Sequence, residues 1–295
     1  MAIPTKKYQY IVPTDSDHVA HKILAMVPHG SRVLEIGCSS GSQTRLLKNT
    51  LGCSVTGIEI NAAAAEDARE FCERLIIGDI ENLNLTEDLG NQPFDVIILS
   101  DVLEHLKQPG DTLIKIRPLL GQSGILLASI PNIAHAAICW ELAHGRFDYR
   151  DYGLLDDTHI RFFTKKSITH LLEGSGYFIA AWERIIKRPQ ETEFEVRPLS
   201  AEGNAFLAWI EGQNPEADTF QFVVKAHSTE QRGMFESDLQ EVQAEINTAR
   251  AKILQLKQDN QQLASQIDWL EGHRFGGLTP LFESLRQWLW STKKK

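Results

Sequence analysis

The sequence predicts an α/β fold built on a parallel sheet, followed by a long C-terminal helix. Over the first 230 residues, short apolar runs alternate with amphipathic segments, which is typical of parallel strands joined by crossover helices. The run at 94–99 is apolar without alternation, as a strand buried on both faces requires. From residue 239 the apolar positions instead recur every three or four residues, which predicts a helix that pairs with another helix.

These two periods assign the elements in chain order. We expect the last two strands to form an antiparallel hairpin that closes five parallel strands, with an insertion at about 190–217 between them. The predicted helices are 17–27, 42–51, 62–72, 111–119 and 167–175, with a short one (AFLAWIEG) in the insertion. The predicted strands are 32–36, 54–59, 74–77, 94–99, 124–130, 177–187 and 219–226.

The segment VLEIGCSSG, residues 33–41, ends the first predicted strand in an acidic, glycine-bearing turn. Glycine lets the backbone approach a ligand closely, and Glu59, at the end of the next strand, is placed to accept hydrogen bonds from a ribose. Dinucleotide enzymes usually read G-x-G-x-x-G, whereas here Glu35 stands two residues before the first glycine. An acid there suits a cofactor with an ammonium group and no phosphate. Alone, the motif also fits an ordinary strand-to-helix turn.

The pattern Glu35-x-Gly37-x-Ser39-x-Gly41 resembles the E/D-x-G-x-G-x-G signature of class I S-adenosylmethionine-dependent methyltransferases, with Ser39 where glycine is commoner. The resemblance covers residues 15–227. It implies a Rossmann-like, seven-stranded methyltransferase sheet of five parallel strands and a closing antiparallel hairpin. It also implies S-adenosylmethionine as cofactor and a methyltransferase activity.

The same resemblance implies a role for each strand-end residue. The turn after the first strand should line the methionine end of the cofactor, and the next two strand ends should hold the ribose and the adenine. Asp101 begins the loop at the crevice beside the switch point of the sheet. The implied cofactor residues are Glu35, Gly37, Cys38, Ser39 and Gly41 at the methionine, Glu59 and Ile60 at the ribose, Asp79 and Ile80 at the adenine, and Asp101.

Methyl transfer is an in-line displacement that often requires a base to remove a hydroxyl proton. Histidine is the natural base near neutral pH, and His105, His135 and His159 follow the fourth and fifth strands. Our hypothesis is that His159, oriented by Asp156 or Asp157, or else His135, acts as this base. A divalent metal held by Asp156, Asp157 and His159 is the alternative that we favour less.

The segment 145–164 is too polar and too aromatic for a core element. We expect it to cap the active site, although a self-paired Ω-loop also fits. Together, IPN-x-AH, GRFDY and LLDDTHIRFFT resemble bacterial methyltransferases found among glycosyltransferases and surface-glycan assembly proteins of the O-antigen type. That resemblance implies a sugar or glycan hydroxyl as acceptor. A non-sugar acceptor (lipid, quinone or natural product) and a catalytically silent dimeric scaffold are the alternatives.

Composition narrows the class of protein. The chain has 295 residues and a net charge of −9, which disfavours a nucleic-acid partner. Its cysteines form no C-x-x-C pair, so neither zinc nor a disulfide framework is indicated. No apolar run is long enough to span a bilayer, and the N-terminus lacks a signal-peptide core. We therefore expect a cytoplasmic enzyme, with peripheral contact to the inner face of the membrane as an option.

The sequence divides into a methyltransferase domain at 1–230, a coiled coil at 234–272 and an amphipathic helix with a basic tail at 278–295. Counting Leu239 as heptad position a puts Ile and one Asn at later a positions and mostly Leu at d. This pattern predicts a parallel homodimer whose register is set by Asn260. A single helix lying on the first domain is the alternative. For 278–295, a membrane-interface helix, a docking helix for a glycosyltransferase partner and packing against the dimer all stay open.

Overall fold

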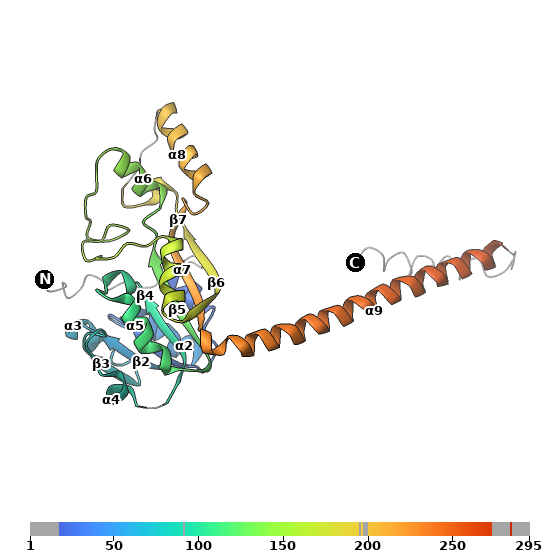
Figure 1. Cartoon of the computed structure of the whole chain (residues 1–295), viewed down its shortest axis with the longest axis horizontal. Coiled ribbons are helices and arrows are strands. Elements are labelled where there is room, and N and C mark those ends of the chain that lie inside the picture. The colour runs from blue at the N-terminus through green and yellow to red at the C-terminus, as the bar shows by residue number, and fades with distance from the viewer. Residues whose placement is uncertain (1–17, 91, 195, 197–199, 273–283, 285–295) are drawn as a thin grey trace. The chain divides into compact units, whose positions relative to one another are not determined.

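The computed structural model describes residues 18–90, 92–194, 196, 200–272 and 284 (Figure 1). The chain divides into two compact units, Met1–Arg232 and Gly233–Lys295. The predicted helix at 278–295 and the first 17 residues of the predicted 1–230 domain lie outside the described residues, apart from residue 284.

The first unit is built on one seven-stranded sheet with the order β3-β2-β1-β4-β5-β7-β6. Strands β1 to β5 run parallel, while β7 runs antiparallel to both β5 and β6. The predicted sheet of five parallel strands and a closing antiparallel hairpin is thus confirmed. The strands are β1 (Arg32–Ile36), β2 (Ser54–Glu59), β3 (Arg74–Ile77), β4 (Phe94–Ser100), β5 (Leu120–Pro131), β6 (Tyr177–Ile186) and β7 (Thr219–Ser228).

Helices cover both faces of this sheet, as parallel strands require. Helices α5 and α7 contribute to the core on one face, and α1 and α2 contribute to the core on the other. The helices are α1 (Val19–Leu24), α2 (Ser42–Leu51), α3 (Ala62–Ala68), α4 (Leu85–Leu89), α5 (Pro109–Ile116), α6 (Ala136–Ala143), α7 (Lys165–Gly174), α8 (Ala201–Gln213) and α9 (Arg232–Gly272), and the 3-10 turns are η1 (Leu103–His105), η2 (Arg117–Leu119), η3 (Pro189–Glu191) and η4 (Thr229–Gln231).

Strand β4 shows why its sequence is apolar without alternation. Ile97 and Leu99 belong to the core on one face of the sheet, and Val96 and Ile98 belong to the core on the other. All four side chains are fully buried, because successive side chains of a strand point to opposite faces.

The parallel register brings the carboxyl ends of the strands to the same level. Ile36, the last residue of β1, pairs with Ile58 on β2 and with Leu99 on β4, and Leu99 pairs with Ala128 on β5. The chain segments that leave these strands therefore emerge along one edge of the sheet. Ligands of open α/β sheets bind at this edge.

Several boundaries differ from the sequence prediction, among them the start of β5 and the end of α3. Strand β5 begins at Leu120 rather than at residue 124, because Leu120 pairs with Phe94 ahead of a register shift in the β4–β5 ladder. Helix α3 ends at Ala68 rather than at residue 72, although alanine and its neighbours favour helix. Local propensity is overridden here by the turn that leads into β3.

A smaller hydrophobic core lies between α6 and α8, beyond the carboxyl edge of the sheet (Figure 1). Leu207 and Ile210 of α8 pack there with Ala136 and Ala137 of α6. The long insertion between β6 and β7 thus supports the segment that follows β5.

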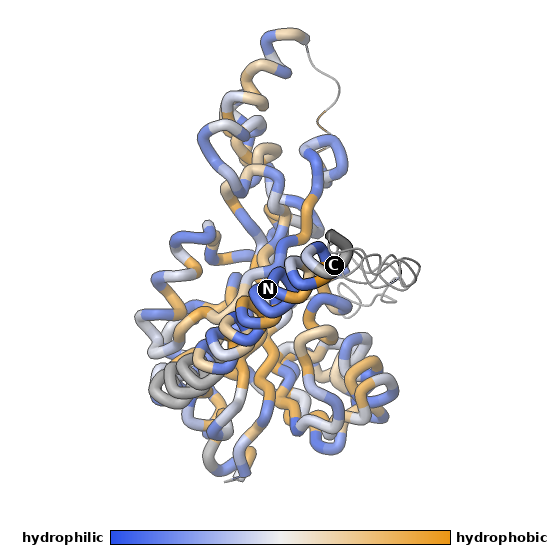
Figure 2. The backbone as a smooth tube through the Cα atoms, turned by 90° about the vertical axis from the view of Figure 1, so that its right-hand side faces the viewer, coloured by the Kyte–Doolittle hydropathy of each residue, from blue (hydrophilic) through white to orange (hydrophobic). Residues whose placement is uncertain are grey.

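The second unit contains the long helix α9, which confirms the predicted C-terminal helix. Along residues 243–269, Ile246, Ile253, Leu256 and Leu263 are exposed at the predicted a and d positions. Figure 2 shows hydrophobic residues recurring along a mainly hydrophilic helix. Within the described residues, no helix is long and apolar enough to cross a membrane. The parallel homodimer stays a prediction.

We predict that the full chain sediments as a dimer and that a chain ending at Arg232 sediments as a monomer. Ile253→Asp should also yield a monomer, since a charge at an a position would be buried in the seam. Leu254→Asp is the matched control. Leu254 is 59 % exposed and Ile253 54 %, but Leu254 lies outside the a and d positions. A monomeric full chain, or equal effects of both variants, would contradict the coiled coil.

Candidate active site

A cavity of about 570 Å³ opens at the carboxyl edge of the sheet. Its walls come from the turns that follow β1, β2, β3 and β4, from residues 152–159 and from the start of β7. These segments are far apart in sequence and meet because the parallel strands end at one level. The cavity therefore lies where the topology predicts a ligand.

The turn after β1 needs glycine at two places. Gly37 has φ +76°, and a Cβ there would lie 2.7 Å from Cγ2 of Val102. Gly41 has φ +79°, and a Cβ there would lie 2.8 Å from Cα of Ala68. Ser39 between them adopts φ +47°, which disfavours side chains with a Cβ and explains why glycine would also suit this position.

Glu35, in β1, points its carboxylate toward the start of α2. The side chain is 3 % exposed. It accepts hydrogen bonds from Nε2 of Gln43 at 3.0 Å and from Oγ1 of Thr44 at 2.6 Å. Burial raises the pKa of Glu35 to about 7, because removing a carboxylate from water disfavours its charged form.

Glu59, at the end of β2, joins two turns through its carboxylate. One oxygen accepts the backbone N–H of Ser39 at 2.8 Å, and the other accepts that of Asn61 at 2.8 Å. Each carboxylate oxygen has two acceptor positions, so each retains the capacity to accept one more hydrogen bond. Two neighbouring hydroxyl groups are the ligand that such an arrangement fits.

Asp79 and Ile80 follow β3 in the next turn. The Asp79 carboxylate caps this turn by accepting the backbone N–H of Glu81 at 2.9 Å and Nδ2 of Asn82 at 2.7 Å. Ile80 is buried beside it. Together they give the cavity one polar and one apolar surface at this end.

Asp101 follows β4 with φ +53°, a strained backbone for a residue with a side chain. Its backbone N–H donates to Oγ of Ser129 at 3.0 Å, and its carboxylate accepts hydrogen bonds from Ser129 and Gln221. The side chain is exposed to the cavity, while the protein packed around it raises its pKa to about 7 by desolvation.

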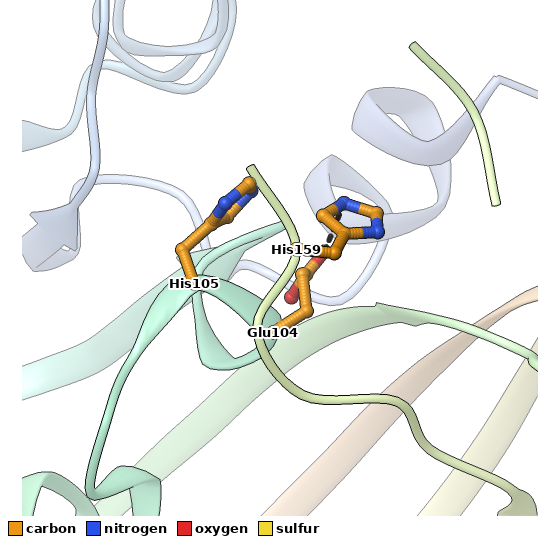
Figure 3. Close-up of side chains that lie close together, drawn as sticks. All are labelled: Glu104, His105 and His159. Carbon is orange, nitrogen blue, oxygen red and sulfur yellow. Dashed lines mark ion pairs between the residues drawn. The ribbon is translucent and has the colours of Figure 1, made fainter. Parts of the chain in front are cut away.

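Glu104, His105 and His159 also line the cavity, and Figure 3 shows the Glu104 carboxylate beside the two imidazoles. Glu104 is 1 % exposed, and its Oε1 lies 4.0 Å from Nε2 of His159. The two rings are 4.9 Å apart, edge to face. Burial raises the pKa of Glu104 well above its ordinary value, and the charges of Asp101 and Asp156 add to this effect.

Residues 152–161 are held against η1 by the backbone of Glu104. Its carbonyl oxygen accepts the N–H groups of Ile160 at 2.9 Å and Arg161 at 3.0 Å. Asp156 is buried and accepts hydrogen bonds from both the backbone and the hydroxyl of Thr158. The expectation that segment 145–164 caps the active site thus has a structural basis in residues 152–159, which line the cavity.

His135 is not brought to the cavity lining. It is fully buried at the N-terminus of α6, where Nδ1 accepts the backbone N–H of Ala137 at 3.2 Å. Its Nε2 lies 2.8 Å from the carbonyl oxygen of Lys187, to which it donates. Burial lowers the pKa of His135. The geometry makes it a helix cap rather than a base in this cavity.

Most of the candidate residues predicted from the sequence meet in this cavity, although their roles stay predictions. Glu104 was missed, because its sequence position gives no sign of its burial. His135, Gly41 and the exposed Asp157 do not line the cavity. Those that do are Glu35, Gly37, Cys38, Ser39, Glu59, Ile60, Asp79, Ile80, Asp101, His105, Asp156 and His159.

A family model described as a methyltransferase domain matches residues 8–181, more than half of the chain. The ubiquinone biosynthesis O-methyltransferase of Xanthomonas campestris pv. campestris (strain B100) is 25 % identical over 203 residues, covering 64 % of this chain and 82 % of that protein. The mitochondrial enzyme of the same name from Schizosaccharomyces pombe is 30 % identical over 104 residues, 34 % of this chain and 38 % of that protein. The hybrid PKS-NRPS synthetase traA of Penicillium crustosum is 29 % identical over 119 residues, 38 % of this chain and 3 % of that protein. The chain thus spans less than half the length of the last two.

Solved structures share the fold. An S-adenosylmethionine-dependent methyltransferase from Aquifex aeolicus has a TM-score of 0.50 at 14 % identity, covering 77 % of this chain and 98 % of that one. The [4+2]-cyclase SpnF has a TM-score of 0.50 at 16 % identity, covering 75 % and 84 %. Since a cyclase is among them, the fold alone does not define the reaction.

We predict that Glu35→Gln stabilises the cofactor-free protein more at pH 8 than at pH 5. The folded state keeps a proton on Glu35 up to about pH 7, whereas the unfolded state releases it near 4.5. The free energy of unfolding of the wild type therefore falls by up to about 3 kcal/mol as the pH rises from 4.5 to about 7. A Gln at position 35 stays neutral at every pH, so the variant does not show this fall. Chemical denaturation at both pH values measures the difference, with the exposed Glu173→Gln as control. Equal effects of Glu35→Gln at the two pH values would contradict this.

Proposed function

We propose that this chain, which belongs to the methyltransferase domain family and is an S-adenosylmethionine-dependent methyltransferase, transfers the methyl group to a hydroxyl oxygen of a small acceptor. The observation that carries the proposal is one cavity lined by two different sets of side chains. One set consists of the strand-end carboxylates of Glu35, Glu59 and Asp79. The other set is the cluster of Glu104, His105 and His159, in which Glu104 and His159 are buried and His105 is half-buried.

The cofactor would occupy the wall made by β1, β2 and β3. Glu59 would accept hydrogen bonds from both ribose hydroxyls, since each of its oxygens carries only one backbone donor. Asp79 would face the exocyclic amine of the adenine, with Ile80 against the ring. Glu35 would attract the ammonium group of the methionine end, which the glycines of the neighbouring turn approach closely.

The carboxyl groups of the cavity lining support a cationic ligand. S-adenosylmethionine carries a sulfonium and an ammonium group, and the attraction of opposite charges is strengthened where water is excluded. Lys107 is the one lysine in the cavity lining within the described residues. Against it stand seven carboxyl side chains: Glu35, Glu59, Asp79, Glu81, Asp101, Glu104 and Asp156.

The transfer itself is a displacement at carbon. An oxygen lone pair of the acceptor forms the new C–O bond to the methyl group, and the electron pair of the breaking C–S bond returns to sulfur, which becomes a neutral thioether. The hydroxyl proton passes to a base or to water as the C–O bond forms, so the acceptor oxygen must be activated. We assign this activation to the cluster of Glu104, His105 and His159.

A sugar hydroxyl, in surface polysaccharide biosynthesis, is the acceptor class that we propose first. It is supported by the sequence resemblance of residues 131–164 and by the polar side chains of Asp101, Gln221 and Asp156 in the cavity lining. Tyr152 also lines the cavity and is 70 % exposed, so its ring offers a flat surface to a sugar ring. Polar groups of this kind select acceptors that can pair with them.

A phenolic hydroxyl is the second candidate, because two of the related proteins are described as ubiquinone biosynthesis O-methyltransferases. Phenols are more acidic than sugar hydroxyls and therefore need less activation. The cluster of Glu104, His105 and His159 would activate a phenolic hydroxyl as well as a sugar hydroxyl.

The rest of the assembly is proposed from the sequence pattern. The exposed seam of α9 supports a parallel homodimer, which would hold two catalytic domains together. We further propose that the enzyme is cytoplasmic and that residues 278–295 contact a glycosyltransferase partner or a membrane surface.

The acceptor class is tested by incubating the full chain with methyl-labelled S-adenosylmethionine and three panels of acceptors. The panels are nucleotide sugars with glycan fragments, catechols with other phenols, and primary amines. We expect labelled product from the sugar panel, with label on oxygen by mass spectrometry. Turnover of phenols alone would replace the sugar by the second candidate. Methylation of amines, or of no panel while the cofactor binds, would contradict hydroxyl transfer.

We predict that Glu59→Gln weakens binding of S-adenosylmethionine by about 10- to 100-fold, because hydrogen bonds to a charged acceptor contribute about 1.5–3 kcal/mol. Calorimetric titration measures this without any acceptor. Glu66→Gln is the matched control, since Glu66 is exposed, pairs with Arg69 and lies outside the cavity lining. Equal affinities of wild type and Glu59→Gln would contradict the ribose assignment.

A further inference from the structure

We propose that Glu104, His105 and His159 bind one divalent transition-metal ion, and that this ion activates the acceptor hydroxyl. The inference deepens the proposed hydroxyl transfer and rests on it for its catalytic part. One ligand atom from each residue lies within 4.8 Å of the other two, and all three residues line the cavity. A single ion placed among them can therefore reach all three.

The Glu104 carboxylate is the first argument. Both of its oxygens are buried and neither has a hydrogen-bond partner. Its approach to Nε2 of His159, at 4.0 Å, is longer than a hydrogen bond. Buried carboxyl groups in native proteins are paired or coordinate metals. We therefore expect a ligand from outside the chain at these two oxygens.

The orientation of the two imidazoles is the second argument. Nδ1 of His159 lies 3.3 Å from the carbonyl oxygen of Leu154, and Nδ1 of His105 lies 3.2 Å from that of Thr158. A carbonyl oxygen only accepts, so each Nδ1 is the donor. In a neutral ring this leaves Nε2 with the lone pair. Metal-binding histidines are oriented in the same way, by donating their other ring N–H to a carbonyl or carboxylate.

The donor set favours a class of metal. Two imidazoles and one carboxylate suit Zn²⁺, Mn²⁺ or Fe²⁺ better than Mg²⁺ or Ca²⁺, which prefer oxygen ligands. Three protein ligands also leave a coordination position open, as catalytic sites do. The open position would face the cavity, where the acceptor binds.

This site differs from the metal alternative considered from the sequence, which combined Asp156, Asp157 and His159. The Asp156 carboxylate accepts two hydrogen bonds from Thr158, and Asp157 is exposed and absent from the cavity lining. Only His159 is common to both sets.

The ion would act as a Lewis acid without changing its oxidation state. An acceptor hydroxyl bound to it loses its proton to water near neutral pH, since metal binding lowers the pKa of a bound hydroxyl group. The metal-bound oxygen then uses a lone pair to form the C–O bond, and the C–S electron pair goes to the sulfur. The same coordination would fix the oxygen in line with the methyl group.

The test uses the untagged full chain, freed of metal by a chelator. Titration with Zn²⁺ by calorimetry, and with Co²⁺ by its visible absorption, should give one equivalent bound. Glu104→Gln and His159→Ala should each weaken binding by more than about 100-fold, since even the loss of a residue that only orients a ligand costs 10- to 100-fold. Glu173→Gln and His170→Ala, both exposed on α7, should bind as wild type does.

Two further readouts keep the outcomes separate. X-ray absorption of the Zn²⁺-loaded wild type needs no variant and should show two imidazole ligands; their absence, or no stoichiometric binding, would overturn the site. If the ion binds as expected but no hydroxyl acceptor is methylated, the proposed function fails and the site stands. If the chelated enzyme methylates its acceptor at an unchanged rate, the activating role of the ion fails and the transferase stands.

Discussion

Burial of the central strands on both faces fixes the register of the sheet and with it the position of the cavity. Strand β4 contributes alternate side chains to the cores on both faces of the sheet, so a one-residue slip against β1 and β5 would exchange the side chains that pack into the two cores. The parallel strands consequently end at one level. Polar residues that would be costly in the middle of the sheet lie at its carboxyl edge, where Glu59 ends β2 and Asp79 and Asp101 follow β3 and β4.

The same placement concentrates carboxyl groups in one cavity. Desolvation raises the pKa values of Glu35 and Asp101 to about 7, and the Glu104 carboxylate has no hydrogen-bond partner. These groups cost stability in the absence of a ligand. A cationic cofactor and a metal ion would offset that cost.

Much of this arrangement could be predicted from the sequence, because strand ends are visible as the points where apolar runs stop. Glu35, Glu59, Asp79 and Asp101 could be predicted in that way, and the last two predicted strands were expected to form the closing antiparallel hairpin. The role of His135 could not be predicted, because a polar residue after a strand caps a helix as readily as it faces a ligand. Glu104 was overlooked because its neighbours do not reveal that its carboxylate is buried; only the fold brings His159 to it, from 55 positions along the chain.

We propose that one cavity holds the cofactor on its strand-end carboxylates and presents the methyl group to Glu104, His105 and His159. A crystal structure of the full chain with S-adenosylhomocysteine tests it most directly. We expect both ribose hydroxyls on Glu59, the adenine between Asp79 and Ile80, and the sulfur directed toward Glu104 and His159. A nucleoside bound elsewhere, or a sulfur turned away from that cluster, would contradict it.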